Sequence, residues 1–356
     1  MSDEPALRDG PPWAMEEMID AEPALVEPVL AAPAAAELAG WIGAAVDAGE
    51  PVTLAGCGTS EHAAMGGAAM LRDAFDHGRL PAARLVAARD SFEAAVDPQS
   101  GGVLVGISHE GGTEATLDAA RAAAERGARV ALVTARLERA PADALAVATP
   151  LRDRSWCHTV GYVSPLLALH AVACHLRGEE PDAAAARAVL DAGLARRDAL
   201  TAAAARLHGC VRLLAVASGA DEVTARELAL KVEEGVHVPT TPLGLEKVLH
   251  GHLPACDERT GLVVLRLDPR AGERRDARVR DLLAAAAELR MPSVTVDAAE
   301  LPLPPTLEPV DGALLAGAVA LQLLTLALVH AAGTNPDLIR REQPAYRAAA
   351  AAAGAG

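Results

Sequence analysis

The feature that most constrains the fold of this chain is a pattern that recurs along it: an apolar run, a glycine turn and a helical segment. The run Val52–Ala55 ends at "GCGTSEH" (56–62) and continues as helical sequence. The pattern returns in "GGVLVGISHEGGTEATLDAARAAAERG" (101–127) and in "VRLLAVASGADEVTARELALKVEEG" (211–235). Strand, turn and helix in this order are typical of parallel sheets covered by helices. The pattern therefore predicts an α/β protein.

The rest of the chain extends this pattern into two rounds of similar length. A chain of 356 residues suits two ordinary domains, and the simplest arrangement is two parallel sheets flanked by helices. The segment 236–254, "VHVPTTPLGLEKVLHGHLP", is expected to be a loop, and 270–280, "RAGERRDARVR", to form a solvated helix face. Within the repeated pattern, strands are expected at 103–107 and 211–217, and further strands at 83–88, 128–135, 260–268 and 292–297. Helices are expected over about 163–206, with a break at "RGEEPD", and over 273–290 and 314–333.

Charge and cysteine content narrow the class of protein. The formal net charge of -16 opposes binding to nucleic acid or to an anionic membrane surface. The five cysteines form no Cys-x-x-Cys pair, and the first ten residues, "MSDEPALRDG", do not resemble a secretory signal. We therefore expect a cytoplasmic protein.

The most apolar run, residues 314–333, approaches the length that crosses a bilayer. It carries Gln322 and His330, and its small residues suit close helix packing. We expect a buried helix and no membrane partner.

Two glycine turns, 56–62 and 108–114, follow expected strands and open expected helices. Glycines allow a ligand close to the backbone, and the N–H groups at a helix start favour an anion. Ser60, Ser108 and Thr113 add hydroxyl donors. The alternative is that these residues only cap helices. Neither turn is a dinucleotide or Walker motif, so no cofactor is expected.

A second group of polar residues lies in the helical segment "TARELALKVEEG" (224–235). Glu227, Lys231 and Glu234 share one helix face, which would also suit a solvated, salt-bridged surface. The segment that follows carries His237, His250 and His252. A carboxylate that moves a proton between adjacent carbons and an imidazole that opens a ring are what sugar isomerisation requires.

Other motifs are weaker. His170 and Cys174, and Cys157 with His158, have spacings that occur in zinc sites, but no second pair has ligand spacing. Cysteine is commonly a small buried apolar residue, so no metal is expected. The chain has no Gly-x-Ser-x-Gly motif of serine hydrolases.

"GCGTSEHA", "GISHEGGTEAT" and "ARELALKVEEG" followed by "LHGHLP" occur in the order found in the double sugar isomerase (SIS) domain family. The chain most resembles the isomerase part of glutamine:fructose-6-phosphate aminotransferase. Residues 15–30 resemble the entry segment of that family, and 333–344, "GTNPDLIRREQP", resemble its tail. The resemblance implies two tandem three-layer domains. Their expected bounds are a leader 1–34, a first SIS domain 35–190, a second SIS domain 191–332 and a tail 333–356.

The resemblance also implies roles. Glu234 would move the proton between C1 and C2, Lys231 would assist it, and His250 would open the ring from the partner subunit of a homodimer. The ligand would be a sugar phosphate. The residues implied to bind it are Gly58, Thr59, Ser60, Ser108, His109, Glu110, Gly111 and Thr113.

Five departures from the family stand out. The phosphate loop has Glu110 where the family has a serine and Gly112 where it has a glutamate, and the tail has arginines but no lysine. The tripeptide that begins with His250 is "HGH" rather than "HGP", and no glutaminase domain is expected. Glu110 must therefore turn away, be protonated, pair with a base such as His109, or face a ligand without phosphate. The alternatives to a sugar-phosphate isomerase or aminosugar deaminase are a phosphosugar sensor without activity and an isomerase of unphosphorylated sugars.

Overall fold

The computed structural model describes residues 5, 7–76, 83–301 and 303–354. Its chain divides into two compact units, each described here by itself. The first unit comprises Glu22–Arg152 and Val160–Arg187. The second unit comprises Met1–Ala21, Asp153–Thr159 and Ala188–Gly356. The outermost residues of the expected leader and tail, 1–4, 6 and 355–356, lie outside the described residues.

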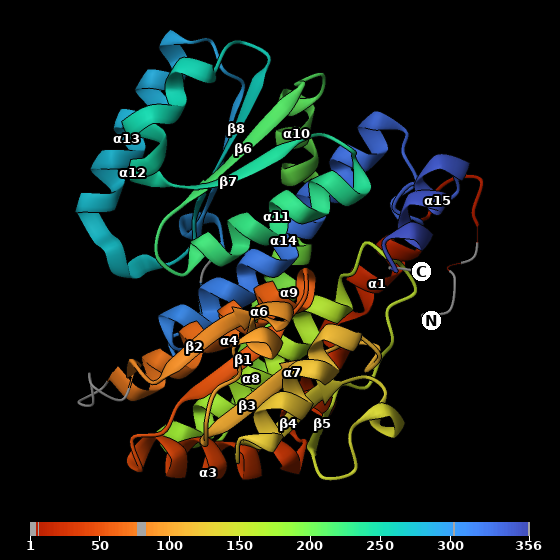
Figure 1. The fold of residues 1–356 in the computed structure, drawn as a ribbon. Helices are drawn as coiled ribbons and strands as arrows, with labels where there is room; N and C mark the ends of the chain where they lie inside the picture. The colour runs from red at the N-terminus through yellow and green to blue at the C-terminus, as the bar shows by residue number, and fades with distance from the viewer. Residues whose placement is uncertain (1–4, 6, 77–82, 302, 355–356) are drawn as a thin grey trace. The chain divides into compact units, whose positions relative to one another are not determined.

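The first unit is built on a five-stranded parallel sheet with the order β2-β1-β3-β4-β5 (Figure 1). Helices α6 and α7 pack against each other, and α8 packs against α3 and α4. The strands are β1 (Val52–Gly56), β2 (Val86–Asp90), β3 (Val103–Ile107), β4 (Arg129–Thr134) and β5 (Leu145–Ala148). The helices are η1 (Glu22–Leu25), α2 (Val26–Leu30), α3 (Pro33–Asp47), α4 (Thr59–Asp76), α6 (Ser91–Val96), α7 (Glu114–Glu125), η2 (Leu137–Arg139) and α8 (Val160–Arg177).

The core of this first sheet uses small side chains, as a chain with only 2% aromatic residues requires. One cluster joins strand residues such as Ala55 and Leu104 to Ala119, Ala120 and Ala123 on α7. Alanine brings helix and sheet backbones close together, so the helix starts are held firmly at the edge of the sheet.

The second unit has a four-stranded parallel sheet with the order β7-β6-β8-β9. Its strands are β6 (Arg212–Ala217), β7 (Thr240–Gly244), β8 (Thr260–Arg266) and β9 (Ser293–Asp297). Its helices are α1 (Ala14–Ala21), α10 (Arg197–Leu207), α11 (Asp221–Gly235), α12 (Leu245–Lys247), η3 (Val248–His252), η4 (Leu253–Ala255), η5 (Pro269–Ala271), α13 (Gly272–Glu288), η6 (Ala298–Glu300), α14 (Pro309–Ala332) and α15 (Pro344–Ala352). The chain passes from the first unit to the second within α9 (Ala183–Leu194).

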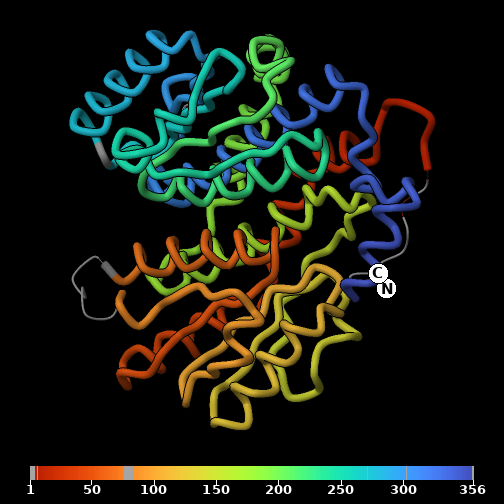
Figure 2. The backbone as a smooth tube through the Cα atoms, turned by 45° about the horizontal axis from the view of Figure 1, so that its top comes forward, coloured from red at the N-terminus to blue at the C-terminus, as the bar shows by residue number. Residues whose placement is uncertain are grey.

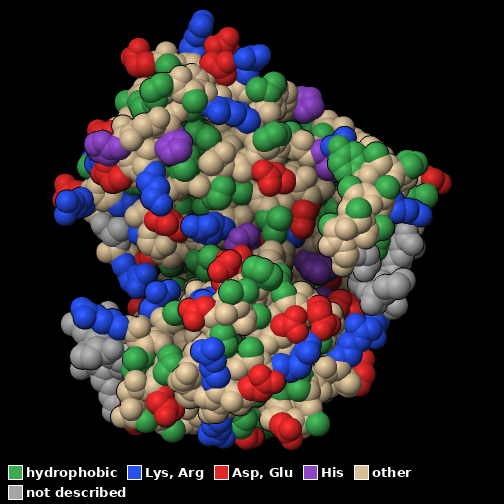
Figure 3. Space-filling view, viewed as in Figure 1, with side chains coloured by type: hydrophobic (Ala, Val, Ile, Leu, Met, Phe, Trp, Pro, Cys, Tyr) green, Lys and Arg blue, Asp and Glu red, His purple; other side chains and the backbone are tan. Residues whose placement is uncertain are grey.

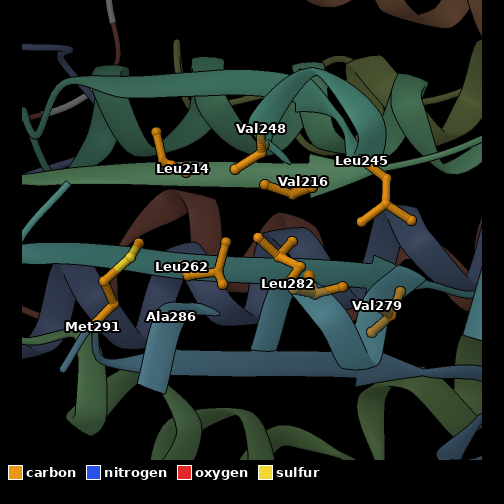
Figure 4. Packing of buried hydrophobic residues seen from close by; sticks show 10 residues of the cluster. Leu214, Val216, Leu245, Val248, Leu262, Val279, Leu282, Ala286 and Met291 are labelled. Atoms are coloured by element: carbon orange, nitrogen blue, oxygen red, sulfur yellow. The ribbon is translucent and has the colours of Figure 1, made fainter. Parts of the chain in front are cut away.

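The core between the second sheet and α13 is aliphatic. Figure 4 shows side chains from β6 and β8 meeting those of α13 and of the turn after β7. The buried members are Leu214, Val216, Leu245, Val248, Leu262, Val264, Val279, Leu282, Ala286 and Met291.

The apolar helix α14 packs against α10 and α11. A Cβ on Gly317 would lie 2.5 Å from the Thr224 hydroxyl oxygen, so α14 and α11 approach closely at this glycine. Among the described residues, α14 is the single helix long and apolar enough to cross a membrane, and its most apolar stretch is entirely buried. Burial of this helix, expected from the sequence, is confirmed.

The leader helix and the tail lie side by side although they are more than 300 residues apart in sequence (Figures 1 and 2). The buried carboxylate of Asp337 accepts hydrogen bonds from the backbone N–H groups of Ala14 (2.8 Å) and Met15 (2.9 Å), which open α1. The Asp337 carbonyl oxygen accepts a bond from the N–H of Trp156. These contacts fix the start of the tail within the second unit.

Two predictions about this unit were wrong. The expected loop 236–254 contains the strand β7, an edge strand that tolerates Pro242 because one side of it has no ladder to complete. The arginine-rich segment 270–280 is not wholly solvated, because Arg275 is buried beside Asp221 and Asp268.

Candidate functional site

The two glycine turns of the first unit lie beside each other at the carboxyl edge of its sheet. β1 pairs with β3 in parallel, with Ala55 opposite Gly106, so the turns after both strands start at the same level. From β1 the chain goes to β2 on one side and then to β3 on the other, which makes this pair the switch point of the sheet. Ligands of open parallel sheets bind at such points.

The turn after β1 depends on its glycines. A Cβ on Gly56 would lie 2.3 Å from the carbonyl carbon of Ser60, and Gly58 has a φ of +56°. Thr59 and Ser60 form the start of the 18-residue helix α4. Thr59 is buried, whereas Ser60 is partly exposed. The N–H groups of this helix start favour an anion.

The turn after β3 is held by its own side chains. The Ser108 hydroxyl donates to the Thr113 hydroxyl (3.2 Å), and Gly111 has a φ of +62°. Ser108 and His109 are buried, and Thr113, which precedes α7, is exposed. The expected binding residues of the first unit thus fall on two neighbouring turns.

Glu110, the unusual acid of this turn, is paired with arginines. One carboxylate oxygen accepts from Arg136 Nε (3.1 Å) and from an Arg152 terminal nitrogen (3.4 Å). Arg139 donates to the Glu110 carbonyl oxygen (3.0 Å). The side chain of Glu110 is 14% exposed. The carboxylate is therefore compensated from within the first unit, so it opposes a bound anion less than its charge alone implies.

The second departure in this loop, Gly112, lies beside Arg139. A Cβ on Gly112 would lie 2.9 Å from an Arg139 guanidinium nitrogen, which is the far end of a flexible side chain and can move aside. The structure therefore gives no steric reason for the glycine at this position.

The corresponding turn of the second unit is closed by its own residues. Asp268, after β8, accepts from the N–H of Ala220 (3.3 Å), which precedes α11, and pairs with Arg270 (2.8 Å). Asp221 accepts from the N–H groups of Leu267 and Asp268. Burial raises the pKa of the Asp221 carboxyl to about 6, although Arg275 opposes the shift. An internal carboxylate thus occupies the helix start where a ligand would bind.

The opposite end of α11 carries the predicted acid and base. Lys231 and Glu227 are 0% exposed, and their charged atoms are 3.6 Å apart. Lys231 also donates to Glu234, whose side chain is 22% exposed. Because two of the three groups are fully enclosed, this face of α11 is not the solvated surface that the sequence left open.

Burial shifts the ionisation of this group of residues. Burial raises the pKa of the Glu234 carboxyl above its usual value, against the Lys231 ammonium that lowers it. Burial also lowers the affinity of Lys231 for its proton, but the carboxylates of Glu234 and Glu227 outweigh this and raise the pKa of Lys231. Lys231 is thus a fixed cation beside a carboxylate that takes up a proton more readily than usual.

Glu234 borders an open pocket of about 390 Å³ within the second unit. Its other walls come from the residues after α11 and from the tail, which Thr334 ties to α11 through a bond to the Gly235 carbonyl oxygen (2.7 Å). The lining residues are Glu233, Glu234, His237, Val238, Pro239, Ile339, Arg340 and Tyr346. His237, Arg340 and Tyr346 were not among the predicted site residues, although the sequence places His237 with His250 and His252 in the histidine-bearing segment after α11.

His250 lies elsewhere on the second unit. Its side chain is 74% exposed, and its Nε2 is 3.2 Å from Glu246, which also accepts from Arg278. The histidine that lines the Glu234 pocket is His237. The ring-opening role and the partner subunit implied for His250 stay predictions.

The chain matches known proteins in their structures but not in their sequences. No protein-family model matches the sequence, and no curated protein matches it. The chain is similar to the C-terminal domain of glucosamine-fructose-6-phosphate aminotransferase from Francisella tularensis, with a TM-score of 0.71, 17% identity and coverage of 93% of this chain and 99% of that one. The chain has the SIS fold.

Two further structures with this fold show the range of their activities. Tagatose-6-phosphate ketose/aldose isomerase from Escherichia coli matches with a TM-score of 0.73 and 18% identity, covering 94% of this chain and 98% of its own. Glucosamine-6-phosphate deaminase from Thermotoga maritima matches with a TM-score of 0.69 and 16% identity, covering 91% and 96%. The SIS fold inferred from the sequence motifs is confirmed.

Proposed function

We propose that this chain is a sugar-phosphate aldose/ketose isomerase or an aminosugar-phosphate deaminase/isomerase, built from two tandem SIS domains. One observation carries the proposal: a carboxylate with a raised pKa, Glu234, stands beside the enclosed cation Lys231 at the edge of an open pocket. The similar structures support the proposal, because one is named as an isomerase, one as a deaminase and one as a domain of an aminotransferase.

In this proposal, the first unit binds the phosphate end of the ligand. The N–H groups and hydroxyls of the turns after β1 and β3 act as donors, and the pairing of Glu110 with Arg136 and Arg152 reduces its repulsion of the phosphate. The residues assigned to binding are Gly58, Thr59, Ser60, Ser108, His109, Glu110, Gly111 and Thr113.

The second unit supplies the chemistry. Ionised Glu234 removes the proton from C2 of the open-chain aldose and returns it to C1 of the enediol, which gives the ketose. The raised pKa brings the carboxyl closer to working pH, so that it can both accept and return the proton. The Lys231 ammonium stabilises the negative charge that develops beside it. These steps require no cofactor.

We further propose that the protein is a cytoplasmic homodimer, in which His250 of one protomer opens the sugar ring in the site of the other. This arrangement can be tested by mixing two inactive proteins, Glu234→Gln and His250→Asn. A mixed dimer restores one complete site, so about a quarter of wild-type activity should return after subunit exchange. Recovery of no activity would assign His250 to the site of its own protomer, and an active His250→Asn protein would assign it to no site.

The enzyme assay uses hexose and hexosamine 6-phosphates and the same sugars without phosphate. We expect isomerisation or ammonia release from a phosphorylated sugar, and a loss of about 100-fold to 10,000-fold in kcat in Glu234→Gln with little change in KM. Glu233→Gln is the matched control, because Glu233 lines the same pocket but is held by the Thr240 N–H (3.0 Å). Full activity in Glu234→Gln would overturn the assignment.

One observation favours a second candidate, a phosphosugar sensor without activity. The tail that borders the pocket contributes Arg340 to it, whereas the catalytic lysine of the SIS synthase tail has no counterpart in this chain, and a guanidinium does not give up its proton near neutral pH. A phosphorylated sugar that raises the melting temperature without any turnover would support the sensor. An isomerase of unphosphorylated sugars would instead act equally well on sugars without phosphate.

A further inference from the structure

His237 is a second titratable group in the Glu234 pocket, and the proposed function leaves it without a role. Its backbone is unusual: φ is +65°, a left-handed conformation that few non-glycine residues adopt. The His237 N–H donates to the Val232 carbonyl oxygen (3.0 Å), which holds the residue just beyond the end of α11. The chain therefore keeps a strained histidine at a fixed place beside Glu234.

The imidazole has one nitrogen in use and one available. His237 makes a hydrogen bond to the backbone of Glu234, whereas its Nε2 is buried and has no hydrogen-bond partner among the described residues. The bond to Glu234 therefore uses Nδ1, which must donate because the partner is a carbonyl oxygen. The neutral ring then carries its proton on Nδ1 and a lone pair on Nε2.

Burial, more than the surrounding charges, keeps this ring neutral. Burial and the nearby Arg340 lower the pKa of His237, while Glu342 and the bond to Glu234 only partly oppose them. A neutral imidazole with a free lone pair is a proton acceptor at neutral pH. The titratable and charged groups around the pocket are Lys231, Glu233 and Glu234 on α11, Cys157 before α8, and Arg340, Glu342 and Tyr346 in the tail.

Isomerisation of an open-chain aldose moves two protons. One passes from C2 to C1, which the proposed function assigns to Glu234. The other passes from the O2 hydroxyl to the O1 carbonyl oxygen, and it needs a group that can both accept and donate. Lys231 is fully enclosed with its carboxylates, an arginine does not release a proton, and Glu233 accepts a hydrogen bond from the Thr240 N–H. His237 combines a side chain that titrates near neutrality with a nitrogen that has no partner among the described residues.

We propose that His237 Nε2 carries the proton between O2 and O1 while Glu234 carries the proton between C2 and C1. Nε2 accepts the O2 proton, the ring becomes imidazolium, and the same proton is then donated to O1. The enediol forms and collapses to the ketose with no net change on either side chain. This role rests on the proposed function and deepens it.

The test compares His237→Asn with the active wild type. Asparagine adopts the left-handed conformation readily and keeps a donor for the Glu234 carbonyl oxygen, but it lacks Nε2, so the variant should fold. We expect kcat to fall about 100-fold with KM changed less than threefold, and the limb of the pH profile due to His237 to disappear.

A second readout separates catalysis from a structural effect. In D₂O, Glu234 of His237→Asn should still exchange the C2 proton, so exchange should exceed isomerisation by at least about tenfold relative to wild type. Unchanged kcat in His237→Asn, or an equal loss of exchange and isomerisation, would overturn the role of His237 alone. An inactive wild type would overturn the proposed function and this role together.

Discussion

The two units arrange the first three strands of their sheets in the same way, but different residues follow those strands. In each, the first strand is central, the second strand lies on one side and the third on the other. After β1 and β3, glycines and hydroxyls surround a helix start. After β6 and β8, Asp268 and Arg275 occupy the equivalent place, where a Cβ on Gly219 would lie 2.7 Å from the Arg275 guanidinium. A shared topology therefore does not imply a shared ligand site.

The difference also concerns the carboxyl edges of the two sheets. In the first unit glycines and hydroxyls follow β1 and β3, whereas the second unit has Asp268 and Arg275 at that edge and the Lys231–Glu234 pair at the opposite end of α11. Figure 3 shows acidic and basic side chains interspersed on the visible face rather than gathered in one basic patch. A phosphate would therefore depend on local donors, as the net charge of -16 requires.

Among the substitutions that compare the two units, Gly56→Ala is expected to have the largest effect on stability and binding. The new Cβ would overlap the Ser60 backbone at 2.3 Å, and backbone cannot move aside cheaply. We expect a loss of more than about 4 kcal/mol in stability and no binding of a sugar phosphate. Gly219→Ala in the second unit is the control: its left-handed φ should cost about 1 to 3 kcal/mol while binding remains. Urea unfolding measures the stability of the two variants, and calorimetry measures their binding of the sugar phosphate. If Gly219→Ala lost binding as completely as Gly56→Ala, the two turns would not differ in function.

Asp268→Ala tests whether the second turn is structural. It leaves Arg275, 8% exposed, without one of its two carboxylate partners. We expect a loss of about 3 kcal/mol in the free energy of unfolding, with the Kd of a sugar phosphate changed less than twofold. A large change in Kd with little change in stability would make this turn a ligand site.

Asp221 should give the second unit a pH dependence. Its folded pKa of about 6 lies above the ordinary value, so the folded chain binds this proton more tightly than the unfolded chain. The stability contributed by this group is therefore greatest at low pH and falls by up to about 3 kcal/mol as pH rises from 4 to 6. Asp221→Asn should lose that slope, whereas Ser108→Ala in the first unit should keep it. Parallel pH curves for Asp221→Asn and wild type would contradict the raised pKa.

Glu110→Gln should have the smallest effect. The change removes one negative charge from the loop, beside Arg136 and Arg152. We expect affinity for a sugar phosphate to rise two- to tenfold, an effect that weakens at high salt. Unchanged affinity at low salt would place the phosphate away from this loop.

Much of the fold could be predicted because its strands end in recognisable turns. β3 matches the expected 103–107, and β1, β6 and β8 were found within two residues. β5 and β7 were missed because neither has an apolar run followed by a glycine turn and a helix: β5 is the short "LAVA", and β7 is an edge strand containing Pro242.

Contacts between candidate site residues could be predicted where the residues lie on one helix, because their spacing brings them together. Lys231 and Glu234 are three residues apart on α11, and the structure pairs them. The partners of Glu110 lie 26 and 42 residues away in sequence, after other strands, so only the fold brings them together. Arg340 could not be placed at the Glu234 pocket for the same reason, since Asp337 and Thr334 position the tail through tertiary contacts.

Exchange of sugar protons with solvent tests directly whether Glu234 moves the proton between C1 and C2. The wild type is incubated in D₂O with the phosphorylated sugar that binds best, and deuterium at C1 and C2 is followed by NMR. We expect incorporation at these carbons by the wild type and by Glu233→Gln, and none by Glu234→Gln. Incorporation at an undiminished rate in Glu234→Gln, or none in a wild type that binds the sugar, would contradict this role of Glu234.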